Sequence, residues 1–216
     1  SNDGQARGPE KSVRNVGDSG PVREDSRDTS ERRATILEAA TQLFLRYGFK
    51  KTSMEDLARA AGLSRPGLYL HFATKEALFK AAVLHLVERT RAAALLPLED
   101  LSAELEPRLV LAFEAIHGLA IGQERAAHLS ELMETAERLV GPVIAEMEQG
   151  FAAELARALR RAGVAEHWKA LGVSAKDLAE HLAAVSTGLK HRVQTRAEYR
   201  EQLKVALRLV CRGRGD

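Results

Sequence analysis

Apolar side chains recur every three or four positions from residue 30 onward, the spacing that places them along one face of an α-helix. The first apolar stripe consists of Ile36, Leu37, Ala40, Phe44 and Tyr47. It predicts a helix over about 30–47, with Gly48 as the residue that ends it. A half-buried strand would instead alternate apolar and polar residues, and the sequence shows no such segment. The pattern therefore predicts an all-α fold.

Start and stop signals divide the rest of the chain into further helices. Thr52 and Glu55 are spaced as a capping box at the start of the second helix. Pro97 disfavours helix at the residue before it, which predicts that the fourth helix stops near Leu96. About nine helices result, and we expect them at residues 30–47, 52–62, 65–72, 75–96, 107–121, 124–140, 143–162, 175–193 and 196–212.

Residues 52–72 combine two short predicted helices with a tight turn of sequence Ala-Gly-Leu-Ser. Gly62 permits the left-handed backbone that reverses the chain, and Leu63 is placed between the two helices. The apolar residues available to pack around it are Leu57, Ala58 and Leu68. This arrangement predicts a helix-turn-helix, whose second helix enters the major groove of DNA. An ordinary pair of short helices in a bundle gives the same turn pattern and is the alternative.

The distribution of charge favours the DNA-binding interpretation. The whole chain holds 32 Lys and Arg against 30 Asp and Glu, and this near balance excludes a polybasic protein that binds polyanions over its entire surface. Residues 29–80 alone hold nine basic and five acidic side chains, a local net charge of +4. The polar side chains on and just after the second helix of the motif are Ser64, Arg65, Tyr69, His71 and Lys75. Hydroxyls and cations of this kind suit phosphate oxygens.

The segment from Met54 to Leu78, MEDLARAAGLSRPGLYLHFATKEAL, resembles the N-terminal DNA-binding domain of the TetR (tetracycline-repressor-like) family. The family pattern combines an AG[VL]S turn, an LYxHF segment and a following KExL, and all three are present in order and at the right spacing. The preceding helix fits as well, so the resemblance covers about residues 30–90. It implies a homodimeric transcriptional repressor that binds a palindromic operator in double-stranded DNA.

The resemblance also implies roles for individual residues. Those at positions that contact phosphate in the family are Thr52, Tyr69, His71 and Lys75. Those at the tip of the recognition helix, where bases are read, are Ser64, Arg65, Pro66 and Gly67. The family more often has Thr, Ser or Ala in place of Gly67, so Arg65 is expected to dominate base recognition through a guanine edge. A phosphate contact by Arg65 is the open alternative.

Residues 1–28 hold almost no large apolar side chain and are expected to form a flexible arm. We expect 29–75 to be the helix-turn-helix DNA-binding domain and 76–216 an effector-binding and dimerisation domain. Two apolar stripes on the last two helices suit a four-helix interface between two copies or, alternatively, burial within one chain. The stripe residues are Leu178, Leu182, Val185, Leu189, Leu203, Leu207 and Val210.

The central helices are expected to enclose a pocket for a small, largely apolar effector. Candidate lining residues are Phe113, Ile116, His117, Leu129, Met133, Met147 and Phe151. Met and aromatic residues at helical spacing equally form an ordinary core, which is the alternative for each of them. A ligand that favours one spacing of the two recognition helices would release the DNA.

Other kinds of chemistry lack a pattern in this sequence. The single Cys211 excludes an internal disulfide, and the sequence contains no HExxH, nucleophile elbow or Gly-rich phosphate loop. We therefore expect no enzyme activity, no metal and no cofactor, and no membrane span because no apolar run reaches 18 residues. One cysteine and no visible signal segment favour the cytoplasm. A ligand-binding all-α protein whose helix-turn-helix is only structural is the alternative to a regulator.

Overall fold

The structure, a computed structural model, describes residues 22–121 and 123–211, with side chains described over 29–121 and 129–211. Within this part of the chain all regular structure is helical, which confirms the all-α prediction of about nine helices. The helices are α1 (Val22–Lys51), α2 (Met54–Ala60), α3 (Arg65–His71), α4 (Lys75–Glu99), α5 (Leu105–His117), α6 (Gln123–Val140), α7 (Val143–Arg161), α8 (Val164–Trp168), α9 (Ala175–Arg192) and α10 (Arg196–Cys211), with 3-10 helices η1 (Gly118–Ala120) and η2 (Lys169–Leu171). The short α8 and η2 were not predicted.

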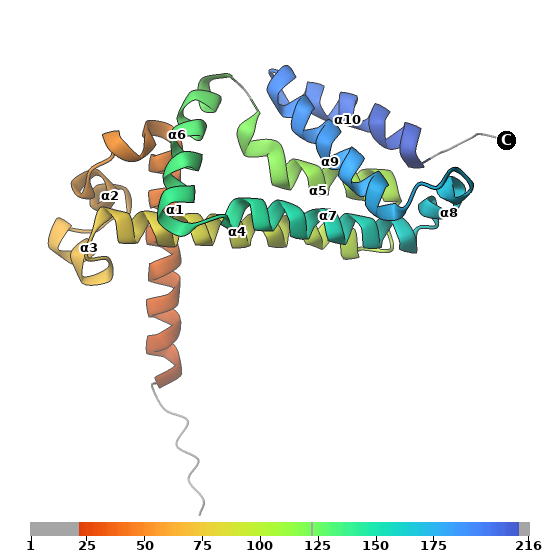
Figure 1. Ribbon diagram of the computed structural model, residues 1–216. Coiled ribbons are helices and arrows are strands. Elements are labelled where there is room, and N and C mark those ends of the chain that lie inside the picture. The colour runs from red at the N-terminus through yellow and green to blue at the C-terminus, as the bar shows by residue number, and fades with distance from the viewer. Residues whose placement is uncertain (1–21, 122, 212–216) are drawn as a thin grey trace, which may run out of the picture.

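The first of two hydrophobic cores joins the N-terminal helices to α6. It is built by α1, α2, α3 and the first turns of α4, where the rings of Phe44, Phe49 and Phe79 contact one another at centroid distances of 4.9, 5.0 and 5.9 Å. Leu132 and Ala136 of α6 are buried in the same core. Figure 1 shows α6 running beside α1. The N-terminal packing unit therefore includes a helix that lies far downstream in the sequence.

The second core lies between α5, α7, α9, α10 and the C-terminal half of α4. Its fully buried side chains include Leu109, Phe113, Leu155, Leu182 and Leu203. In Figure 1, α7 lies along α4, and α5 packs between α4 and α10. Trp168 of α8 donates its indole N–H to the carbonyl of Val210 over 2.9 Å, which ties α8 to the end of α10.

Helix α4 contributes to both cores and is longer than predicted. It continues through Pro97 to Glu99, whereas the sequence predicted its end near Leu96. Arg108 of α5 explains the difference, because its guanidinium donates to the carbonyls of Pro97, over 2.9 Å, and of Leu98. Carbonyls at a helix C-terminus lack partners within the helix, so this buried arginine stabilises the extra turn.

The N-terminal boundaries also differ from the prediction. Helix α1 begins at Val22, so residues 22–28 of the predicted arm are helical, whereas residues 1–21 lie outside the described part of the chain. Helix growth adds one backbone hydrogen bond per residue to turns already formed, which extends α1 through polar sequence without an apolar stripe. Gly48 has a φ of 80°, and here α1 kinks before its last residues. The structure thus places a break where the sequence predicted the end of the helix.

Candidate nucleic-acid interface and ligand cavity

The helix-turn-helix forms as predicted, with one shift in its capping residue. Ser53, and not Thr52, caps α2, since its hydroxyl accepts from the amide of Asp56 over 3.1 Å and the Asp56 carboxylate accepts from the amide of Ser53. Gly62 has a φ of 67° in the turn, which requires a glycine-like backbone. Leu57, Ala58 and Leu68 are buried around the turn. Ser64 caps α3 by accepting from the amide of Gly67 over 3.1 Å.

Helix α3 leaves its polar side chains on the surface. Ser64, Arg65, Pro66 and Tyr69 are exposed, and Gly67 and His71 are half-buried. The guanidinium of Arg65 lies 5.8 Å from the ring centroid of Tyr69, so the two side chains form one surface feature. Leu70 was missed by the sequence analysis and is 88% exposed on this helix. A large apolar side chain without packing partners inside the chain is a signal for contact with another molecule.

Two predicted phosphate contacts are committed to internal hydrogen bonds. Thr52 is buried, and its hydroxyl donates to the carbonyl of Gly48 over 2.7 Å, so it has no open surface for a phosphate. Lys75 is half-buried at the start of α4, where its ammonium donates to the carbonyls of Phe49 and Thr52, each over 3.1 Å. It also lies 4.3 Å from the centroid of the Phe49 ring. The carbonyls at the end of α1, which lack partners within the helix, thus accept hydrogen bonds from Lys75, for which the resemblance implied a phosphate contact.

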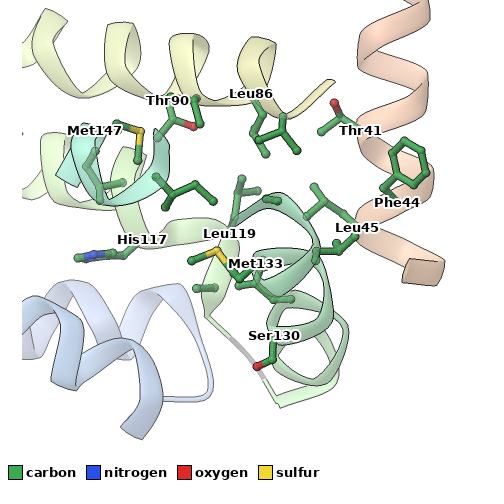
Figure 2. A pocket seen from close by; sticks show the side chains of 18 of the residues that line it. Thr41, Phe44, Leu45, Leu86, Thr90, His117, Leu119, Ser130, Met133 and Met147 are labelled. Carbon is green, nitrogen blue, oxygen red and sulfur yellow. The ribbon is translucent and has the colours of Figure 1, made fainter. Parts of the chain in front are cut away.

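A cavity of about 590 Å³ lies where the two cores meet. This volume falls within the range of roughly 300–1,000 Å³ that is typical of small-molecule sites. Its walls come from α1, α4, α6, α7, η1 and the ends of α5 and α9 (Figure 2). The lining is mostly apolar, and lining residues that the sequence analysis missed include Thr41, Phe44, Leu45, Leu86, Val87, Thr90 and Leu119. Helix α1 was not expected to contribute, because α6 brings it to the cavity through contacts that no local pattern reveals.

Five of the seven residues predicted to line a ligand pocket do line this cavity. They are Ile116, His117, Leu129, Met133 and Met147. Phe113 and Phe151 do not, because their rings pack edge to face at a centroid distance of 5.2 Å inside the second core. For these two residues the alternative of an ordinary core position is the one observed.

The polar end of the cavity is organised around His117. Its Nδ1 lies 2.6 Å from the hydroxyl oxygen of Ser186, which is in turn hydrogen-bonded to the hydroxyl of Tyr199. All three side chains are buried. Burial lowers the pKa of His117 from 6.5 to about 4, with smaller contributions from the positive charges of Lys190 and His191. At neutral pH the imidazole is therefore uncharged.

The predicted interface residues on the last two helices are largely used inside the chain. Six of the seven are buried in the second core, namely Leu178, Leu182, Leu189, Leu203, Leu207 and Val210, and Val185 is half-buried. The apolar periodicity identified the buried face of each helix correctly. It could not show whether that face is buried within one chain or against a second copy. The six buried side chains therefore face the core of their own chain, which is the alternative that the sequence left open.

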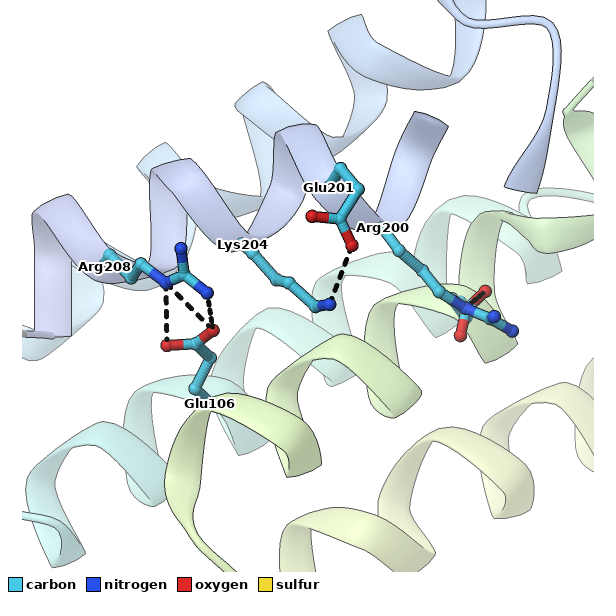
Figure 3. A network of polar contacts seen from close by, with 6 residues as sticks. Glu106, Arg200, Glu201, Lys204 and Arg208 are labelled. Carbon is cyan, nitrogen blue, oxygen red and sulfur yellow. Dashed lines mark hydrogen bonds and ion pairs between the residues drawn. The ribbon is translucent and has the colours of Figure 1, made fainter. Parts of the chain in front are cut away.

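The outward surface of α9 and α10 is a different set of residues. Val205 and Leu209 of α10 are 56% and 71% exposed. Ala184 and Gly188 of α9 are exposed as well, and nothing lies within 4 Å of where a Cβ of Gly188 would be. We call these four residues the outer face. Charged side chains of α10 are used elsewhere: Arg200 reaches Glu114 over 2.7 Å and Arg208 reaches Glu106 over 3.2 Å, both on α5 (Figure 3).

The described residues form neither a cluster of metal ligands nor a membrane-spanning helix. No group of three or more His, Cys, Asp or Glu side chains there is arranged to hold a metal ion. No helix of this part of the chain is long and apolar enough to cross a membrane. Cys211 is half-buried, and burial raises the pKa of its thiol to about 11.

Residues 36–82, which contain the whole helix-turn-helix, match the sequence profile of the bacterial regulatory proteins of the tetR family. This segment of the chain is similar to the DNA-binding segment of the TetR family. The chain is 43% identical to the uncharacterized HTH-type transcriptional regulator YfiR of Bacillus subtilis over 53 residues, which make up 24% of this chain and 26% of YfiR. It is 38% identical over 60 residues to the HTH-type transcriptional regulator TtgR of Pseudomonas putida, 28% and 29% of the two chains. The matches thus span less than a third of these relatives.

Solved structures extend the likeness of fold beyond this segment. A transcriptional regulator from Aquifex aeolicus superimposes with a TM-score of 0.61 at 18% identity, covering 83% of this chain and 99% of the other. A putative TetR-family regulator from Rhodococcus sp. gives a TM-score of 0.59 at 23% identity, covering 84% and 99%. The helical layout of both cores is therefore shared with TetR-family structures.

Proposed function

We propose that this protein is a transcriptional repressor that binds a palindromic operator in double-stranded DNA as a homodimer and is released by a small, largely apolar effector. The observation that carries this function is the position of the cavity, whose walls include α1 and α4 of the same packing unit that exposes α3. A ligand there contacts the helices that hold the recognition helix. The relatives' names, which describe transcriptional regulators and a repressor, support the same function.

The exposed residues of α3 supply the DNA contacts in this proposal. Arg65 donates to a guanine edge or to a phosphate, and Tyr69 and Ser64 donate their hydroxyls to the backbone. Leu70, which is almost fully exposed, meets a thymine methyl group. Thr52 acts from inside the motif, by holding the backbone at Gly48, rather than by touching DNA.

The outer face of α9 and α10 forms the dimer contact in this proposal. Small residues at Ala184 and Gly188 allow close approach of a second copy, and Val205 and Leu209 supply apolar area. Two-fold symmetry is the commonest arrangement of oligomers, and it places two recognition helices about 34 Å apart, one turn of DNA. The ligand shifts the population of dimers away from that spacing by its difference in affinity for the two arrangements.

Selection of bound fragments from random duplex DNA, followed by mobility-shift titration, tests the proposal. We expect a palindromic site, an affinity that falls steeply with salt, and a loss of roughly 1–3 kcal/mol of binding free energy in Arg65→Ala if Arg65 reads a base. Lys80→Ala is the matched control, because Lys80 is an exposed cation on α4 away from α3. Failure to enrich any sequence, or equal affinity of Arg65→Ala and Lys80→Ala, contradicts the DNA-binding role.

A further inference from the structure

The hydrogen-bond relay behind the cavity fixes which nitrogen of His117 carries its proton. The relay consists of Tyr199 of α10, Ser186 of α9 and His117 at the end of α5. Burial raises the pKa of Tyr199 to about 12, so its hydroxyl keeps its proton. A buried O–H without an acceptor costs about 1–3 kcal/mol, and among the described residues Ser186 is the partner of this hydroxyl.

The direction of each bond follows from that requirement. Tyr199 donates to the oxygen of Ser186, and the Ser186 hydroxyl then donates its own proton to Nδ1 of His117. A neutral imidazole that accepts at Nδ1 carries its hydrogen on Nε2. The relay therefore leaves His117 with an N–H donor on the nitrogen that Ser186 does not occupy.

Among the residues whose side chains the structure describes, none places an acceptor within hydrogen-bond distance of Nε2. The nearest carboxylate, Oε1 of Glu148, is 4.0 Å away, and the Glu148 side chain is 45% exposed. His117 lines the cavity together with Glu148, Lys190 and His191, and Lys190 brings positive charge to this end. Figure 2 shows His117 at the same end as Met147, opposite Thr41 and Phe44. The rest of the wall is mostly apolar.

We propose that the cavity selects apolar molecules that carry an acceptor oxygen, as a carbonyl or a carboxylate, and that Nε2–H of His117 donates to this oxygen. This inference rests on the proposed effector cavity and names the chemical class of its ligand. A hydrocarbon without such an oxygen leaves the donor unpaired in a buried site and binds more weakly for that reason. Ser186 and Tyr199 are positioning residues, because they act on the ligand through His117.

The first test observes the tautomer directly in the full chain. Protein labelled with 15N at histidine is examined by long-range 1H–15N NMR, and the His117 signals are assigned by their loss in His117→Gln. We expect the pattern of a neutral imidazole protonated on Nε2. Ser186→Ala with Tyr199→Phe removes both hydroxyls together, so that neither is left unpaired, and shifts His117 toward a mixture of tautomers. A proton on Nδ1 in the wild-type protein overturns the inference.

The second test compares three ligands with the same apolar body. Butylbenzene, methyl 4-butylbenzoate and 4-butylbenzoate displace the neutral fluorescent probe N-phenyl-1-naphthylamine from the protein. We expect the ester, the carboxylate or both to bind about tenfold more tightly than butylbenzene, as one buried hydrogen bond contributes. Which of the two binds more tightly distinguishes a carbonyl ligand from a carboxylate ligand.

Variants separate the donor from the rest of the cavity. His117→Leu is expected to remove most of the tenfold preference and leave butylbenzene binding within about twofold. Leu86→Ala, on the apolar wall, is the matched control and weakens all three ligands alike. Equal binding of the three ligands to wild-type protein overturns the acceptor-oxygen inference while leaving an apolar effector cavity in place. Binding of none of them overturns both.

Discussion

Gly48 decides the path of α1 next to the helix-turn-helix. Its φ of 80° lies in the left-handed region, and a Cβ there would stand 3.0 Å from Oε2 of Glu131 on α6. The sequence predicted the break at Gly48, because a glycine closes an apolar stripe. It could not predict the contact with Glu131, which arises only when α6 packs against α1. The other carboxylate oxygen of Glu131 is buried without a hydrogen-bond partner among the described residues.

Gly48→Ala is expected to lower the free energy of unfolding by about 1–3 kcal/mol, because a Cβ is strained at positive φ and crowds Glu131. Gly150→Ala is the matched control: Gly150 lies within α7, is exposed and has open space around it. Alanine there is expected to stabilise the protein by about 0.5–1 kcal/mol. Urea unfolding followed by circular dichroism measures both. Equal effects of the two substitutions would contradict the strain at Gly48.

His117 makes stability depend on pH in a defined window. The unfolded chain takes up a proton near pH 6.5, and the folded chain only near pH 4. Between these values the unfolded state binds more protons, so the free energy of unfolding falls as pH drops. The loss attributable to His117 approaches ~3 kcal/mol at pH 4.

His117→Gln removes this titration while leaving the carboxylates and the other histidines unchanged. We expect the variant to lose less stability than the wild-type protein between pH 7 and pH 4, with a difference of ~3 kcal/mol at the acid end. Urea unfolding at a series of pH values gives both curves. Parallel curves would mean that His117 is protonated equally easily in the folded and unfolded chains.

At the scale of elements, one cation adds a polar link to the aromatic contact between α1 and α4. Lys75 opens α4 and closes the end of α1 by donating to the carbonyls of Phe49 and Thr52. The motif around Lys75 was visible in the sequence, but the resemblance to the TetR family implied a phosphate as the partner of Lys75. The local sequence shows that a cation lies at the start of a helix. Which carbonyls it binds depends on which other helix end packs beside it in the fold.

Lys75→Gln is expected to lower the free energy of unfolding by about 1–3 kcal/mol, because two carbonyls lose a charged donor in a half-buried place. Lys80→Gln removes the same charge from an exposed position on the same helix and is expected to change stability by less than about 0.5 kcal/mol. Thermal unfolding of the two variants, without DNA, separates the roles. If Lys75→Gln leaves the stability unchanged, the internal hydrogen bonds of Lys75 do not stabilise the fold, and contact with a phosphate remains its predicted role.

Element boundaries show where sequence reasoning succeeded and where it stopped. The prediction of helices at 175–193 and 196–212 agrees with α9 and α10 within a residue or two at each end, because capping signals and apolar periodicity coincide there. The end of α4 was wrong because Arg108, on another helix, satisfies the carbonyls around Pro97. The inward stripes were assigned to a partner chain because periodicity describes a helix face and not what covers it.

For the whole molecule, the division into two packing units differs from the order of the sequence. Helix α6 completes the N-terminal core, and α4 belongs to both cores. The two candidate sites differ in the same way. The exposed residues of α3 could be predicted because they belong to one contiguous motif, whereas the α1 side of the cavity depends on contacts between distant segments. A local sequence motif can therefore be recognised from the sequence alone, whereas a cavity formed by several distant helices cannot.

The outer face of α9 and α10 gives a prediction about assembly. Val205→Glu with Leu209→Glu is expected to yield monomers in sedimentation velocity with little change in thermal stability, because both side chains point away from the core. Leu203→Ala is the contrasting variant, since Leu203 is fully buried, and is expected to cost about 2–5 kcal/mol of stability. A double glutamate variant that remains dimeric would place the interface elsewhere.

Helix α4 runs without interruption from the helix-turn-helix to the second core, so a movement at one end is transmitted to the other. At 1.5 Å per residue its 25 residues span about 37 Å, and Arg108 and Arg161 both donate to the carbonyl of Leu98 near its far end. Because that end is fixed, a ligand that pushes against Leu86 and Thr90 in the cavity would rotate α4 and move its N-terminal end. A rotation of α4 by about 5° around that end displaces Lys75, which lies about 35 Å away, by about 3 Å, and by up to twice that between the two copies of the proposed dimer. In the proposed dimer, ligands that differ by a single methyl group should therefore differ in how far they move the two recognition helices apart.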